Sequence, residues 1–163
     1  MNHSSDHCSE IVVAGFGSPH GDDQAGWRVV EMLERWSVLP ARPVSITEST
    51  QLLDAMEGCR RLILVDGCRA GRPIGTITRL EWPDPRVRQF HNHSTHGVGL
   101  CNALQLAERL GRLPASVEIF GIEIGGHQPF EEMSPSVVQA VAELADTIFS
   151  ELCETIHARA VVG

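Results

Sequence analysis

The chain contains no lysine and no tyrosine, and all 13 of its basic residues are arginines, against 21 acidic residues among 163. The resulting net charge of −8 argues against nonspecific binding to nucleic acid or to an anionic membrane surface. No apolar run approaches the length that is needed to cross a bilayer. We therefore expect a protein that binds neither nucleic acid nor membranes.

Paired cysteine motifs are also missing. The five cysteines are scattered and odd in number, without a Cys-x-x-Cys pair, so the sequence predicts neither a disulfide framework nor a structural zinc site. Residues 1–9 are polar and lack the basic start and apolar stretch of a signal peptide, which predicts a flexible tail and a cytoplasmic location. The length predicts a single domain over residues 1–163, with a monomer as the working expectation for an oligomeric state that the sequence does not determine.

Strand and helix patterns alternate along the chain, which predicts a three-layer α/β/α sandwich with a mostly parallel sheet. The expected strands are 11–16, 43–48, 61–66, 75–81 and 117–122, and the expected helices are 23–37, 51–57 (short), 97–110 and 135–157. Only about nine residues separate the third strand from the fourth, fewer than a helical crossover requires, so the fourth strand should be antiparallel. Residues 82–96 form the longest stretch without a regular pattern.

Three polar motifs follow apolar strands. The first is the glycine-rich run Ile11-Val-Val-Ala-Gly-Phe-Gly-Ser-Pro-His-Gly-Asp-Asp-Gln-Ala-Gly26, in which Asp22 and Asp23 open a helix. Asp22 is expected to cap that helix by accepting hydrogen bonds from its backbone N–H groups, which leaves Asp23 for chemistry. The second is Asp66, after Arg61-Leu-Ile-Leu-Val, and the third is His96, just before the helix at 97–110. Since sites form where parallel strands end, we expect Asp23, Asp66 and His96 to converge.

These motifs resemble those of the hydrogenase maturation proteases. The matching segments are Gly15 to Gly26, Leu64-Val-Asp66 and Ser94-Thr-His-Gly-Val-Gly-Leu100, and the likeness extends over nearly the whole chain, including Gly121-Ile-Glu123 and Ser134-Pro135. The resemblance implies a twisted five-stranded sheet of order 2-1-3-5-4 with strand 4 antiparallel, as in phosphorylase/hydrolase-like folds. It also implies an endopeptidase that removes the C-terminal extension of a nickel–iron hydrogenase large-subunit precursor after nickel insertion.

In the family, one acid from the first motif, an aspartate from the second and a histidine from the third sense the nickel, and here they match Asp23, Asp66 and His96. The family usually has an asparagine at the position of Ser18 and a turn one residue longer, which leaves open whether Asp22 or Asp23 faces the site. Two carboxylates and an imidazole form an incomplete shell suited to nickel, zinc or cadmium. We expect the precursor to carry the nickel and to complete the shell, and zinc or cadmium to substitute in the isolated protein.

The sequence does not determine how the peptide bond is broken. Neither a Gly-x-Ser-x-Gly elbow nor a His-Glu-x-x-His helix is present. Attack by metal-polarised water, with Asp23 or Asp66 accepting the proton, is preferred to an aspartyl-type mechanism that uses the same two carboxylates without nickel. The alternative functions are a nickel-binding accessory protein without proteolytic activity and a different peptidase or amidohydrolase on the same fold. No separate cofactor-binding site is predicted, because acidic residues occupy the glycine-rich turn where a dinucleotide would place its pyrophosphate.

Several other polar residues have undecided roles. His91 and His93 share the loop of His96 and would either add ligands or face solvent. Glu123 and His127 follow a predicted strand and would support the site, contact the substrate or simply lie on the surface. Cys68, close to Asp66 in sequence, is interpreted as a packing residue.

Overall fold

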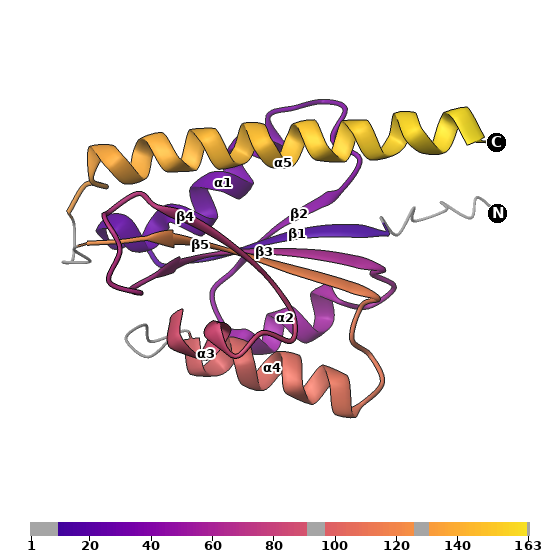
Figure 1. Cartoon of the computed structure of the whole chain (residues 1–163), viewed down its shortest axis with the longest axis horizontal. Helices are drawn as coiled ribbons and strands as arrows, with labels where there is room; N and C mark the ends of the chain where they lie inside the picture. Colours follow the sequence, from indigo (N-terminus) through magenta and orange to yellow (C-terminus); the bar gives the residue numbers. More distant parts are fainter. Residues whose placement is uncertain (1–9, 91–96, 126–130, 163) are drawn as a thin grey trace, which may run out of the picture.

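A five-stranded sheet runs through the middle of the molecule, with helices on both of its faces (Figure 1). This computed structural model describes residues 10–90, 97–125 and 131–162. The strands are β1 (Ile11–Phe16), β2 (Arg42–Ile46), β3 (Arg61–Cys68), β4 (Ile77–Glu81) and β5 (Ser116–Glu123). The helices are η1 (a short 3₁₀ helix, Gly21–Gln24), α1 (Ala25–Glu34), α2 (Ser49–Ala55), α3 (Arg86–Phe90), α4 (Gly97–Arg109) and α5 (Pro135–Val162).

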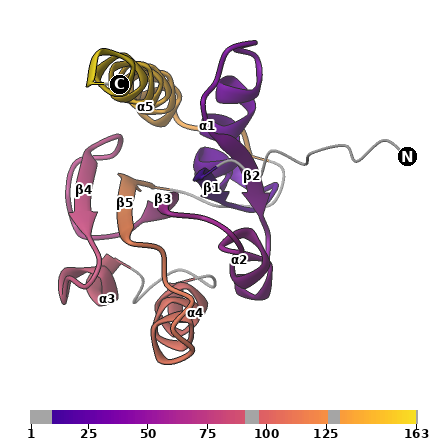
Figure 2. The ribbon, with the colours of Figure 1, turned by 90° about the vertical axis from the view of Figure 1, so that its right-hand side faces the viewer.

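The order of the strands is β2-β1-β3-β5-β4, and β4 alone is antiparallel to its neighbour. Both features confirm the sequence predictions. Helices α1 and α5 cover one face of the sheet, while α2, α3 and α4 cover the other, so the predicted three-layer α/β/α sandwich is also confirmed (Figures 1 and 2). Of the helices in the described part of the chain, none is long and apolar enough to cross a membrane.

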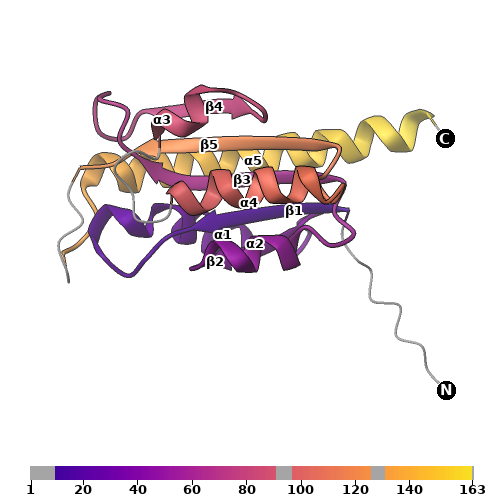
Figure 3. The ribbon, with the colours of Figure 1, turned by 90° about the horizontal axis from the view of Figure 1, so that it is seen from below.

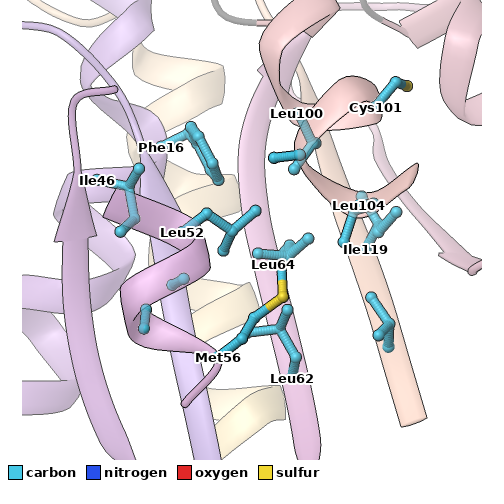
Figure 4. Close-up of a cluster of buried hydrophobic side chains, with 14 of the residues drawn as sticks. Phe16, Ile46, Leu52, Met56, Leu62, Leu64, Leu100, Cys101, Leu104 and Ile119 are labelled. Carbon is cyan, nitrogen blue, oxygen red and sulfur yellow. The ribbon is translucent and has the colours of Figure 1, made fainter. Parts of the chain in front are cut away.

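Each face of the sheet has its own hydrophobic core, because side chains alternate along a strand. On the face of α2 and α4, Phe16, Leu52, Leu64 and Leu100 belong to one buried cluster (Figure 4). On the opposite face a second cluster joins the strands to α1 and α5. The helices therefore cover both faces of the sheet, and the ends of its strands are left for a site.

Strands β1, β3 and β5 end at the same edge of the sheet, which we call the carboxyl edge (left in Figures 1 and 3). Helices α1, α4 and α5 all begin at this edge (Figure 3). Because the first and third sequence motifs precede α1 and α4, the order of elements brings distant parts of the chain to one edge.

The boundaries of several elements differ from the sequence predictions. The first helix was expected over 23–37, but residues Gly21–Gln24 form η1, and α1 ends at Glu34. Gly21 has a positive φ of 49°, a conformation that glycine adopts readily, and this tightens the turn ahead of α1. The interval 82–96 was expected to be irregular, yet α3 begins there at Arg86, where the backbone N–H donates to the Asp84 carboxylate.

Candidate active site

The turn between β1 and α1 holds Asp23 at the carboxyl edge. The Asp23 backbone N–H donates to the His20 carbonyl (3.0 Å), the Ser18 N–H donates to the Asp23 carbonyl (3.1 Å), and the Ser18 hydroxyl donates to the Asp23 carboxylate. A side chain at Gly17 would place its Cβ 2.8 Å from the Asp23 carbonyl oxygen, so the tight turn requires glycine there. Asp23 is only 8% exposed, and its carboxylate is held in a defined position.

Asp22 does not cap the first helix, so this expectation was wrong. Its Oδ1 accepts a hydrogen bond from the Ser134 N–H (2.6 Å), and its Oδ2 accepts from the Gly125 N–H (3.0 Å) and the Ser134 hydroxyl (2.5 Å). Neither η1 nor α1 has a side-chain cap. The reason is tertiary: residues more than 100 positions further along the chain supply donors, and sequence reasoning weighed only the local ones.

Asp66 lies near the end of β3, opposite Gly121 of β5, and is 1% exposed. By the alternation along the strand its side chain shares a face with Leu64 and Cys68, which belong to the cluster beneath α4. The η1 turn contacts β3, because Gly26 packs directly on the backbone of β1 and β3: a Cβ added there would lie 2.6 Å from the Val65 carbonyl oxygen. Asp23 and Asp66 thus come to the same edge from separate elements.

His96 lies outside the described residues, as do His91, His93 and His127. The neighbouring helix α4 is described from Gly97 onward, and its first turn packs against the start of α2: a Cβ added at Gly99 would lie 2.7 Å from the Ser49 hydroxyl oxygen. Within residues 10–90, 97–125 and 131–162 no group of three His, Cys, Asp or Glu side chains is arranged to hold a metal. The position of the histidine relative to the two carboxylates therefore stays a prediction.

Glu123 is buried (4% exposed), which resolves one alternative that the sequence left open. Its two carboxylate oxygens accept hydrogen bonds from the backbone N–H groups of Ala70 and Gly71, both at 2.9 Å. The Cys68 thiol donates to the same carboxylate (3.7 Å). Glu123 therefore shapes the loop that follows β3 and is not a surface residue.

The Cys68 thiol is unsuited to act as a nucleophile. Burial raises its pKa, and the negative charges of Glu123 and Asp66 raise it further. Because the thiolate is the reactive form, this cysteine stays protonated and packs in the core, in agreement with its interpretation from the sequence.

The comparisons with known proteins agree with the fold and with the family that the motifs predicted. A family model described as HycI, hydrogenase maturation protease, matches residues 28–153. The chain belongs to the hydrogenase maturation protease family. Its resemblance to this family, and its assignment as a maturation endopeptidase, are thereby confirmed. Asp66 and His96 fall within the matched range, whereas Asp22 and Asp23 precede it.

Solved structures of similar proteins support the same assignment. The hydrogenase maturating endopeptidase HybD from E. coli is 25% identical over 89% of this chain and 93% of its own, with a TM-score of 0.75. A hydrogenase 2 maturation peptidase from a Thaumarchaeota archaeon is 27% identical over 87% and 97%, with a TM-score of 0.62. The HybD protease from Thermococcus kodakarensis, at 18% identity over 87% and 98% with a TM-score of 0.71, shares the fold. No curated protein sequence gives a significant match.

Proposed function

We propose that the protein is the endopeptidase that removes the C-terminal extension of a nickel–iron hydrogenase large-subunit precursor once nickel has been inserted. The nickel arrives with the precursor and is contacted by Asp23, Asp66 and His96. The observation that carries the proposal is the presence of two buried carboxylates, from η1 and β3, at one edge of the sheet in a member of this family.

The role of Asp22 in the fold supports the choice of Asp23 as the acid of the first motif. All three hydrogen bonds described for Asp22 run to Gly125 and Ser134, so its carboxylate holds loops together. Asp23 instead accepts from Ser18, the residue that stands where the family usually has asparagine. A hydroxyl at this position orients the Asp23 carboxylate within its own turn.

An incomplete ligand set accounts for selection of the loaded precursor. Two carboxylates and one imidazole leave positions on the ion for ligands from the precursor, and only a nickel-loaded precursor gains these contacts. During cleavage, water adds to the carbonyl carbon of the scissile bond, and Asp23 or Asp66 accepts the proton of the water and passes it to the departing amine. Zinc or cadmium would bind the same side chains in the isolated protein.

Cleavage of a nickel-loaded precursor, followed on a gel as loss of the C-terminal extension, tests the proposal. Asp66→Asn and His96→Ala should each abolish cleavage and weaken binding of nickel in a calorimetric titration, because each removes one ligand of the ion. The matched control is His91→Ala, which removes a histidine five residues before His96 in the sequence and should leave cleavage at the wild-type rate.

Three outcomes would count against parts of this assignment. If Asp66→Asn cleaves at the wild-type rate, both the metal-assisted mechanism and the aspartyl-type mechanism are excluded in the form given above. Equal losses from His91→Ala and His96→Ala would show that the ligand set is larger. Wild-type protein that binds nickel and the precursor but does not cleave it would identify an accessory protein and not a protease.

A further inference from the structure

One carboxylate, that of Asp22, accepts hydrogen bonds from both ends of the segment that connects β5 to α5. Asp22 accepts hydrogen bonds from Gly125, just after β5, and from Ser134, just before α5. We call these three residues the Asp22 clamp. Asp22 is 1% exposed, so its carboxylate has exchanged water for three protein donors, which offset the cost of its burial.

The clamp acts on the turn that carries Asp23. Asp22 and Asp23 are consecutive residues of η1, a turn of only four residues without a side-chain cap. The bonds of Asp22 run to the segments just after β5 and just before α5, whereas those of Asp23 to Ser18 and His20 stay within the turn. Bonds within the turn and the bonds from Asp22 to Gly125 and Ser134 therefore both hold η1 in place.

We propose that Asp22 is a positioning residue, which sets the place of the Asp23 carboxylate by fixing η1 to Gly125 and Ser134. This inference rests on the proposed role of Asp23 in contacting the precursor. It assigns the two adjacent aspartates to separate tasks: Asp23 contacts the substrate, and Asp22 acts through Asp23 without touching the substrate.

Replacement by asparagine should break the clamp, although the side chain keeps its shape. Both oxygens of Asp22 face a backbone N–H, Ser134 on one side and Gly125 on the other. An amide has one oxygen, so its NH₂ group must meet one of these donors in either orientation. Ser134→Ala is milder, because it removes the hydroxyl and leaves both backbone donors in place.

The experiment compares Asp22→Asn, Ser134→Ala and Ser134→Thr with Glu118→Gln, which removes a buried carboxylate from an ion-pair cluster elsewhere on the sheet. With nickel-loaded precursor, kcat/KM should fall by about 10²-fold for Asp22→Asn, the size of loss that a misplacement of about 1 Å can cause. The loss should be smaller for Ser134→Ala. Ser134→Thr keeps the hydroxyl and should retain the wild-type kcat/KM. Glu118→Gln should also cleave at the wild-type rate when it is assayed well below its unfolding temperature.

A second readout needs no substrate. The ¹³C chemical shift of the Asp23 carboxyl group should move in Asp22→Asn and stay at the wild-type value in Glu118→Gln. An unmoved Asp23 signal in a folded Asp22→Asn protein would overturn the positioning role, as would equal losses of kcat/KM in Asp22→Asn and Glu118→Gln. If wild-type protein fails to cleave the precursor, the proposed function is wrong, and the Asp23 signal still decides whether Asp22 positions that carboxylate.

Discussion

Among the residues whose burial the structure describes, the buried charges are acidic and most of them lie at the carboxyl edge. The buried charged residues of the described chain are Asp22, Asp23, Asp66, Glu118 and Glu123. Two of the four at the carboxyl edge, Asp22 and Glu123, accept hydrogen bonds from backbone N–H groups of loops. They give these loops fixed conformations, and a site built on fixed loops positions its reacting groups more accurately. Asp23 and Asp66 then serve the chemistry that we propose.

Glu123→Gln should destabilise the fold more than its small change in shape suggests. Each oxygen of Glu123 accepts one backbone N–H, from Ala70 and Gly71, so the amide NH₂ of glutamine must face one of these donors. Leaving a buried donor without an acceptor costs about 1–3 kcal/mol. Urea unfolding should show a loss of this size, and amide hydrogen exchange should rise at residues 69–71. Glu132→Gln, at an exposed position, is the control and should unfold like the wild type; equal stability of the two variants would refute this role of Glu123.

At the scale of elements, α1 approaches the sheet so closely that backbone meets backbone. A Cβ added at Gly15 of β1 would lie 2.1 Å from the Gly26 carbonyl oxygen, and one added at Gly26 would lie 2.1 Å from the Phe16 carbonyl oxygen. Both glycines belong to the first sequence motif. Because these glycines have no side chain, η1 and Asp23 can pack against the end of β3. The glycines of the motif are therefore needed for the packing of a helix on the sheet.

Gly26→Ala should therefore push α1 away from the sheet. Overpacking of this kind costs about 1–3 kcal/mol or more, because the backbone of β1 and β3 cannot rotate aside as a side chain can. Thermal unfolding should show a lowered midpoint. The matched control is Glu34→Ala, at an exposed position at the end of the same helix, which should stay close to the wild type. Equal midpoints for the two variants would mean that the close approach is not required.

The order of the elements could be predicted from the sequence, while the contacts between them could not. Apolar runs and short connections identified every strand and the antiparallel direction of β4. Helix α3 was missed because it is only five residues long and follows a proline-rich segment. The partners of Asp22 were missed because a local rule, helix capping, competed with donors at Gly125 and Ser134 that only the folded chain brings close. A buried Glu123 could not be distinguished from a surface one for the same reason.

At the scale of the whole molecule, a cluster of ion pairs joins the sheet to its longest helix. Glu118 of β5 pairs with Arg61 of β3 (2.8 Å) and with Arg79 of β4, and Arg79 also pairs with Glu151 of α5 (2.8 Å). Glu118 lies in the first half of β5, whereas Asp66 and Glu123 lie at the ends of their strands. The cluster therefore connects the antiparallel edge strand to the rest of the fold away from the candidate site.

The protein should lose stability in acid partly through Glu118. Burial by itself would raise the pKa of Glu118, but hydrogen bonds from Arg79 and Arg61 outweigh it and hold the pKa below its ordinary value. A group whose pKa is lowered by folding stabilises the native state above its unfolded pKa, about 4.3 for glutamate, and this contribution disappears as the pH falls through the folded value.

The difference in unfolding free energy between wild type and Glu118→Gln should consequently be largest near neutral pH and shrink below about pH 4. Urea titrations at neutral pH and below about pH 4 measure this difference in free energy. The control is Glu81→Gln, which changes the exposed residue directly opposite Glu118 on β4. A difference that stays constant over this range would show that Glu118 stabilises the fold through packing and not through its charge.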